Sequence, residues 1–201
     1  MRRELKFGWN TYRLLAAVSA LALVFPVFAT AQVETIDATA RGTSTQMGKI
    51  INIKINITEF STQEDRQALI KAFQQGQSQG LAKALEKMKP VGQLRLPGTT
   101  GYGLAYVMSV PTESGRKVRF VTNRKIAFGE AARNTRSQSY DLTAGEIIIN
   151  DANPKESKGT LLPATQLIVN KEGNLEWNLY QNPWDLTNII DWTKGKEKGK
   201  Q

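Results

Sequence analysis

Apolar and polar side chains alternate most regularly along residues 49–58. Isoleucine stands at every second position of this stretch, with asparagine, lysine and threonine in between. Because successive side chains of a strand point to opposite faces, the stretch predicts a β-strand with one apolar and one solvated face. Such strands are typical of antiparallel sheets that are covered on one side only. The isoleucines of the apolar face are Ile51, Ile53, Ile55 and Ile57.

The period of the apolar residues changes from that of a strand to that of a helix over residues 62–89. Ser61 and Glu64 have the spacing of a capping box, in which the hydroxyl and the carboxylate each satisfy a free backbone amide. Gly76 and Gly80 interrupt the pattern, and since each glycine costs about 1 kcal/mol relative to alanine, we expect one kinked helix or two short ones. The apolar stripe consists of Leu69, Phe73, Leu81, Ala84, Leu85 and Met88.

From residue 91 onward the pattern returns to a period of two, with turns that contain glycine or proline. A strand, then helices, then a run of antiparallel strands indicates an α+β domain. We predict an antiparallel β-sheet of about six to seven strands, with one kinked or two short helices packed on its isoleucine face. The extended segments expected after the helices cover residues 93–96, 104–110, 117–128, 140–142, 146–150, 160–170 and 175–181.

The two ends of the chain differ from the part between them. Residues 1–31 have the basic start, the apolar run and the small-x-small ending of a signal peptide. An uncleaved membrane anchor is the alternative, but the run is short for a spanning helix, which needs about 20 apolar residues. Residues 32–193 would then form a single α+β domain without an integral membrane segment. Residues 194–201, with four lysines and no apolar side chain, would be a disordered basic tail.

Histidine and cysteine are both absent from the 201 residues. The chain therefore has no thiol nucleophile or disulfide, and it lacks the commonest general base and metal ligand. We expect no cofactor and no metal. The formal charge is +9, of which the first 31 residues and the tail carry +3 each, so that residues 32–193 carry only +3. This mild charge argues against specific binding of nucleic acid, while the tail could contact anionic surfaces weakly.

Catalysis without histidine and cysteine would have to use other groups, of which carboxylates are the first to consider. In glycoside hydrolysis one acid protonates the leaving group and a second attacks the sugar or activates water. Glu130 and Asp141 lie in or near the loop after the expected strand 117–128. The alternative for both residues is that they are solvated surface charges.

Arg124 occupies a position that strict alternation within the strand 117–128 would place on the apolar face. A buried guanidinium needs carboxylate or carbonyl partners. Arg124 therefore either pairs with Glu130 or Asp141 inside the protein, or reaches solvent because the chain turns or bulges at residues 122–123. We favour the bulge. If Arg124 is instead buried, it could hold an anionic ligand together with Arg119.

Three tryptophans lie in the C-terminal quarter of the chain, where aromatic rings could stack on sugar rings. Trp177 alternates with Leu175 and Leu179, which favours a core position. Trp184 and Trp192 are more open by their pattern, although a terminal segment often docks through such residues.

Several stretches together resemble a family of exported bacterial proteins. They are the isoleucine strand followed by Thr62-x-x-Asp65-Arg66, then Gly92-x-Leu94-x-Leu96, residues 119–124 and Tyr140-x-Leu142. The resemblance covers most of residues 32–193 and implies export and a single domain. The family has no established activity and no functional residues that could be transferred to this chain.

The sequence therefore predicts a periplasmic or extracellular, non-catalytic domain that binds or scaffolds something in the cell envelope or outside the cell. One alternative is a carboxylate-dependent hydrolase that acts on carbohydrate. Another is weak binding of anionic polymer or membrane surface through the basic tail. The candidate ligand-binding residues are Arg119, Arg124, Glu130 and Asp141.

Overall fold

The computed structural model describes most of the chain between the two ends. The described residues are 34–126, 142–169, 171, 175–179 and 182–193. The predicted signal peptide, the predicted tail, and the candidate residues Glu130 and Asp141 lie outside them.

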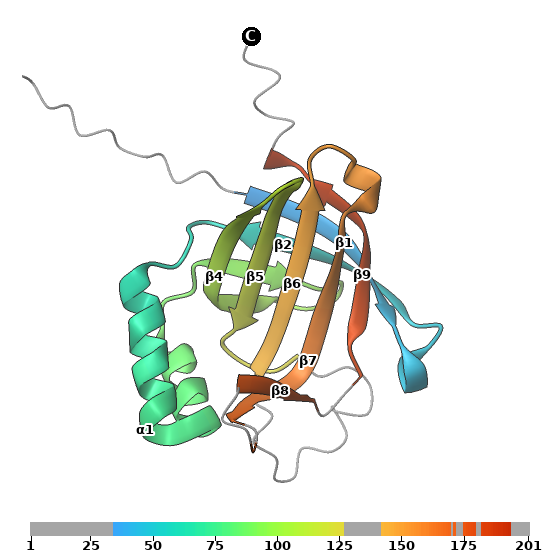
Figure 1. Ribbon diagram of the computed structural model, residues 1–201. Coiled ribbons are helices and arrows are strands. Elements are labelled where there is room, and N and C mark those ends of the chain that lie inside the picture. Colours follow the sequence, from blue (N-terminus) through green and yellow to red (C-terminus); the bar gives the residue numbers. More distant parts are fainter. Residues whose placement is uncertain (1–33, 127–141, 170, 172–174, 180–181, 194–201) are drawn as a thin grey trace, which may run out of the picture. The chain divides into compact units, whose positions relative to one another are not determined.

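Within the described residues there are nine strands, one α-helix and two short 3-10 helices (Figure 1). In chain order they are β1 (Glu34–Gly42), η1 (Ser44–Gln46), β2 (Ile50–Ile57), α1 (Gln63–Lys87), β3 (Gly92–Arg95), β4 (Tyr102–Thr112), β5 (Gly115–Thr122), β6 (Leu142–Asn150), η2 (Pro154–Glu156), β7 (Lys158–Val169), β8 (Leu175–Leu179) and β9 (Trp184–Asp191).

Eight of these nine described strands close into an antiparallel β-barrel. The order around the barrel is β1-β2-β3-β4-β5-β6-β7-β9, and β9 pairs back to β1. Closure depends on the pairing of β7 with β6 on one side and with β9 on the other. β8 pairs with the C-terminal half of β7 and is not part of the ring.

The predicted α+β sheet of six to seven strands with helices on its isoleucine face is therefore wrong. Ile53, Ile55 and Ile57 of β2 are buried as predicted, and Ile51 is half-buried. However, they pack against the other walls of the barrel and not against α1. The alternation of apolar and polar residues is the same in a one-sided sheet and in a barrel, where inward and outward residues also alternate.

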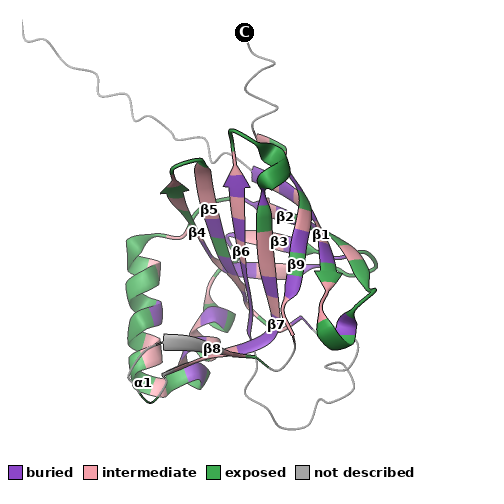
Figure 2. Cartoon of the chain, turned by 45° about the vertical axis from the view of Figure 1, so that its right-hand side comes forward, coloured by how far each residue is buried: buried purple, intermediate pink, exposed green. Residues whose placement is uncertain are grey.

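Side chains of one continuous cluster fill the interior of the barrel. Figure 2 shows the buried positions along the strands from which this cluster comes. The filled interior agrees with the width of an eight-stranded barrel, which leaves just enough room for side chains. Trp184, which the sequence placed in an open segment, is fully buried and is the largest residue of this core. The side chain of Trp177 lies outside the described part. Other fully buried members of the core include Ile36, Ile55, Leu94, Leu104, Phe120, Ile147 and Leu161.

Bulges and one glycine fit the strands to the closed ring. The register shifts once in each of the pairs β1–β9, β4–β5 and β6–β7. Because a bulge bends a strand and increases its twist, such shifts favour closure. Gly145 pairs with Phe120 across β5 and β6, and a Cβ atom at position 145 would collide with the Phe120 ring. The absence of a side chain at Gly145 therefore lets the ring lie flat under β6.

Helix α1 packs on the outside of the barrel, against β4 and β7. It contributes to a second apolar cluster, separate from the interior, that consists of Leu69, Leu81, Leu85, Ala105 and Leu142. The helix is kinked where the sequence places its first glycine, since Gly76 and Gln77 have non-helical dihedral angles. The packing of α1 leaves part of the outer wall open, and this opening is the candidate site.

Candidate functional site

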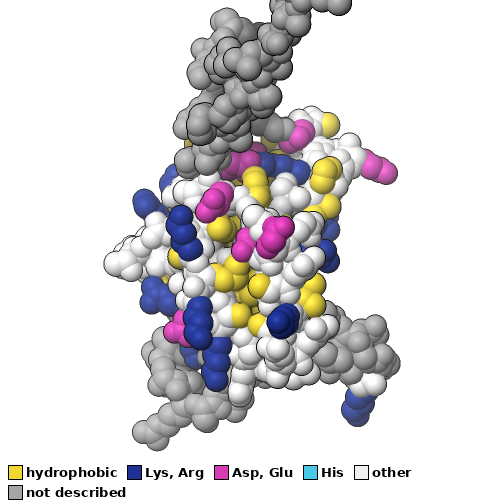
Figure 3. Space-filling view, turned by 90° about the vertical axis from the view of Figure 1, so that its left-hand side faces the viewer, with side chains coloured by type: hydrophobic (Ala, Val, Ile, Leu, Met, Phe, Trp, Pro, Cys, Tyr) yellow, Lys and Arg dark blue, Asp and Glu magenta, His cyan; other side chains and the backbone are white. Residues whose placement is uncertain are grey.

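An apolar groove of about 420 Å³ lies between α1 and the outer surface of β4 and β7. Among the described residues that line it, Arg66 is the only charged one. On the face of the molecule that carries α1, hydrophobic side chains gather in the middle and charged side chains surround them (Figure 3). We call this feature the α1 groove, and it is lined by Arg66, Leu69, Ile70, Phe73, Gln74, Leu81, Tyr106, Met108 and Leu167.

Two hydrogen bonds fix the start of α1 to the barrel. The backbone amide of Ser61 donates to the carbonyl of Val107 at 2.8 Å, and the amide of Val107 donates to Ser61 Oγ at 3.0 Å. The capping box is formed by the next residue, because the Asp65 amide donates to Thr62 Oγ1 and the Thr62 amide donates to Asp65 Oδ2. The predicted box of Ser61 and Glu64 is therefore wrong, since the Ser61 hydroxyl holds the helix to β4 instead.

The kink lets both halves of α1 contribute to the groove. Beyond Gly76 the helix changes direction, and Leu81 of the second half joins the same buried cluster as Leu69 of the first half. At Gly80 a Cβ atom would collide with the carbonyl oxygen of Ala72. The glycine therefore allows the second half of the helix to approach the first, which closes one wall of the groove.

A bulge in β4 produces the floor of the groove. Leu104 and Val107 face the interior of the barrel, while Ala105 and Tyr106 between them both belong to the outer cluster. Ala105 is fully buried and is small enough for α1 to pack closely on it. Tyr106 and Met108 are only half-buried, and the Tyr106 hydroxyl lies 4.0 Å from Met108 Sδ. These two side chains are the part of the floor that a ligand can contact.

The two charged groups nearest the groove differ in whether they already have a partner among the described residues. Burial raises the pKa of the Tyr106 hydroxyl; the positive charge of Arg66 lowers it, and the negative charge of Asp65 raises it. The Asp65 carboxylate is held in the capping box. Arg66 is exposed and forms no ion pair with any other residue in the described part of the chain. The groove therefore has one available cation, near the start of α1.

A second hollow, of about 360 Å³, continues from the α1 groove across β4 to β7 and shares Tyr106 and Met108 with it. Ion pairs lie on its rim: Glu146 is 2.6 Å from Arg119 Nε and 3.2 Å from Lys117 Nζ. Burial tends to raise the pKa of Glu146, but the bonds and charges of Arg119 and Lys117 lower it overall. The predicted residue Arg119 thus lies beside the groove, but a carboxylate already neutralises it.

Arg124 lies on the surface, as the turn interpretation expected. The strand β5 ends at Thr122, the chain bends at residues 123–124, and Arg124 is exposed. Its guanidinium stacks over the Tyr102 ring at 4.9 Å from the centroid, and its Nη2 donates to the carbonyl of Gly101 at 3.1 Å. The expected strand 117–128 is therefore too long, because the Thr122 hydroxyl bonds to the Arg124 carbonyl and closes the turn.

The structure does not bring the two candidate arginines into one site. Arg119 lines the hollow on β4–β7, whereas Arg124 lines a different one of about 470 Å³, together with Lys125 and Lys83 of α1. The anion site of Arg119 and Arg124 is therefore not formed. Glu130 and Asp141 lie outside the described residues.

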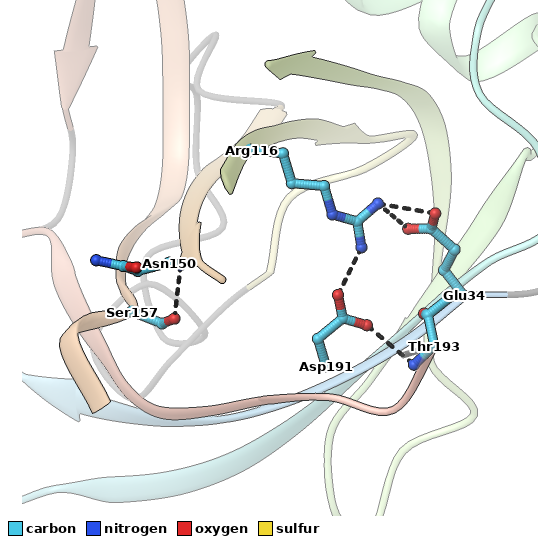
Figure 4. A network of polar contacts seen from close by, with 6 residues as sticks. All are labelled: Glu34, Arg116, Asn150, Ser157, Asp191 and Thr193. Atoms are coloured by element: carbon cyan, nitrogen blue, oxygen red, sulfur yellow. Dashed lines mark hydrogen bonds and ion pairs between the residues drawn. The ribbon is translucent and has the colours of Figure 1, made fainter. Parts of the chain in front are cut away.

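The described residues do bring two other carboxylates together, at one end of the barrel (Figure 4). Arg116 of β5 donates to both oxygens of Glu34 on β1 at 2.8 Å and to Asp191 Oδ2 on β9 at 2.8 Å. Burial alone would lower the pKa of Arg116, but the bonds to Glu34 and Asp191 raise it overall. The guanidinium fills the space between the two carboxylates, where a substrate would have to lie. This cluster joins opposite walls of the barrel and is structural.

Sequence reasoning missed the floor of the groove. It identified the apolar stripe of α1, including Leu69, Phe73 and Leu81, but assigned it to the isoleucine face. The only local signal for the floor is that Leu104, Ala105, Tyr106 and Val107 are four consecutive residues without a polar outward position. Such a run does not reveal a bulge, since a strand buried on both faces has the same composition.

Comparison with family models, with curated proteins and with solved structures finds no match to this chain. In the described part of the chain, no helix is both long enough and apolar enough to cross a membrane. The same residues contain no group of three or more acidic side chains that could hold a metal ion.

Proposed function

We propose that the protein is an exported, non-catalytic binding domain that holds an apolar ligand in the α1 groove. The single observation that carries this proposal is the composition of the groove, in which mostly apolar side chains and one cation, Arg66, line a concave surface of about 420 Å³. This volume is within the range of about 300–1,000 Å³ that is usual for small-molecule sites. Ile70 is 47% exposed at the groove and therefore offers apolar surface that a ligand can cover.

Two further features support a binding role outside the barrel. The interior is packed with side chains, so a ligand would have to bind on an outer surface. The converging carboxylates Glu34 and Asp191 are both bonded to Arg116, which does not favour the hydrolase alternative.

The ligand class that best fits the groove is a single-chain amphiphile with an anionic head group, such as a fatty acid. The apolar floor and the side chains of α1 would contact the alkyl chain, and each buried methylene would contribute about 0.8 kcal/mol. Arg66, which lacks an ion pair among the described residues, would pair with the carboxylate. A ligand of this class also agrees with a location in the cell envelope.

The test is a calorimetric titration of the purified protein with sodium dodecanoate below its micelle concentration. Ile70→Glu should weaken binding about tenfold or more, because the new carboxylate replaces an apolar contact and repels the carboxylate of the ligand. Ile50→Glu is the matched control: Ile50 is 60% exposed and does not line the groove, so affinity should stay unchanged. If wild-type protein does not bind dodecanoate, or if both variants bind equally, the proposal is wrong.

The exported location rests on the basic start, the apolar run and the Ala29-Thr30-Ala31 pattern. N-terminal sequencing of the protein from the producing cells should begin within about two residues of Gln32. Recovery of intact Met1 from the membrane fraction would instead identify an uncleaved anchor.

A further inference from the structure

The wall formed by β1, β2 and β9 lies on the side of the barrel away from α1 (Figure 1). Its outer surface is polar, in contrast to the apolar surface of the α1 groove. Its outward residues form cross-strand polar pairs: Thr35 with Asn56, Asp37 with Lys54, and Thr39 with Asn52. A hollow of about 530 Å³ opens on this wall and extends to β3. We call this outer surface the β1–β9 face. Asp37, Lys54, Arg95 and Asn188 line its hollow, and Trp192 lies beside the hollow, where it bonds to Asp37.

Trp192 stands at the edge of this face in a fixed orientation. Its indole Nε1 donates to Asp37 Oδ2 at 2.8 Å, and its backbone amide donates to the Thr35 carbonyl at 3.0 Å. Nevertheless the residue is 50% exposed. The indole hydrogen bond therefore fixes the ring, the backbone hydrogen bond fixes the chain that carries it, and the exposed part of the ring is available for stacking on a ligand.

The polar groups beside the ring have hydrogen-bonding capacity left over. Asp37 Oδ1 is buried beside Lys54 Nζ at 2.7 Å, whereas Oδ2 accepts only from Trp192 among the described residues and has room for a second hydrogen bond. Arg95 is exposed and uses its Nε for Gln93 Oε1, so its terminal nitrogens have no partner in the described part. Asn188 donates to Thr39, which leaves its amide oxygen to accept.

We propose that the β1–β9 face binds a neutral, β-1,4-linked glycan. The apolar face of one sugar ring stacks on Trp192, and its hydroxyl groups donate to Asp37 and accept from Lys54 and Arg95. Sugar hydroxyls both donate and accept, which matches a face that offers carboxylate, ammonium, guanidinium and amide groups together. The hollow crosses from Asn188 on β9, over β1 and β2, to Arg95 on β3, and the extended chain of a β-1,4-linked glycan suits this long, shallow surface. The site is separate from the α1 groove and does not depend on the function proposed for it.

The experiment is calorimetric titration of the full mature protein with cellohexaose and with chitohexaose. At least one of the two should bind, and Trp192→Ala should weaken that binding about tenfold or more, because it removes the ring on which the sugar stacks. Arg95→Ala, an exposed change on β3, should weaken it less. Phe60→Ala is the matched control, because Phe60 is also an exposed aromatic residue (37%) but does not line the hollow and, unlike Trp192, is not bonded to Asp37.

A second readout separates binding from folding. Trp192→Ala should keep the melting temperature and the dodecanoate affinity of the wild-type protein, since the ring is not part of the core or of the α1 groove. The proposal is overturned if neither hexasaccharide binds, or if Trp192→Ala binds the sugar as tightly as wild type does.

Discussion

The wall β4–β7 and the wall β1–β2–β9 have the same backbone architecture, yet their outer surfaces differ. On β4–β7 the outward positions carry Tyr106, Met108 and Leu162, and α1 covers part of them. On β1–β2–β9 they carry threonine, asparagine and an Asp–Lys pair that face solvent. Apart from the cluster of Glu34, Arg116 and Asp191, the inward positions are mostly apolar on both walls, because both close the same core. The comparison indicates that the inward residues determine the barrel, while the outward residues determine what each wall can bind.

The largest expected effect tests whether the two walls share one interior. Ile55→Ala on β2 and Ile147→Ala on β6 should each lower the free energy of unfolding by about 2–5 kcal/mol, because both side chains are fully buried. Asn52→Ala, on the outer surface of β2, should change it by less than about 0.5 kcal/mol. Urea denaturation measures all three, and a loss on one wall alone would contradict a common core.

The next effect concerns the contact that joins the walls. Arg116→Met leaves two carboxylates near each other without a cation, and because Arg116 is still 18% exposed we expect a loss of about 2–3 kcal/mol, below that of a fully buried pair. The triple variant Glu34→Gln, Arg116→Met, Asp191→Asn removes all three charges and should recover most of this stability. A triple variant as unstable as the single one would mean that the charges are not the cause.

A smaller effect tests the close packing inside the β4–β7 wall. Gly145→Ala should destabilise the protein by about 1–3 kcal/mol, because the added methyl group meets the buried ring of Phe120. Gly76→Ala is the matched control, since no atom lies within 4 Å of a Cβ atom there and its φ of −141° is open to alanine. Equal losses in thermal denaturation would show that the Phe120 contact is not what requires glycine.

The smallest effect comes from the rim of the β4–β7 wall. The pKa of Glu146 is lowered from its ordinary value of 4.5, so the stability it contributes is present above that value and is lost as the pH falls through the lower, folded-state pKa. Glu146→Gln should therefore lower the melting temperature relative to wild type above about pH 4.5. The difference should shrink as the pH falls from there to the folded-state pKa, and it should vanish below that pKa. A parallel shift at every pH would contradict this.

The local elements of this fold could be predicted, whereas its closure could not. The strand around Ile55, the helix and its break at Gly76 all follow from spacing and composition within a few residues. The pairings of β6 with β7 and of β9 with β1 join residues far apart in the chain, and a period-two pattern carries no information about them. This is why the apolar stripe of α1 was assigned to the isoleucine face.

The candidate site shows the same limit at the level of single residues. Arg124 could be placed at a turn because strict alternation would have buried a charge. Arg119 could not be recognised as neutralised, because its partner Glu146 lies on a neighbouring strand whose register is set by the closed ring. Tyr106 was missed because a bulge, invisible in the sequence, turns it outward.

The most direct test of the central claim is to locate a bound alkyl chain on the protein. A dodecanoate analogue with a diazirine at the chain end would be photolysed with the purified protein, and the labelled residues identified by mass spectrometry. The account predicts labels on the α1 groove, at Phe73, Tyr106 or Met108, and their loss when unmodified dodecanoate is in excess. Labels on the β1–β9 face or on core residues such as Phe120, or labels that dodecanoate does not displace, would contradict it.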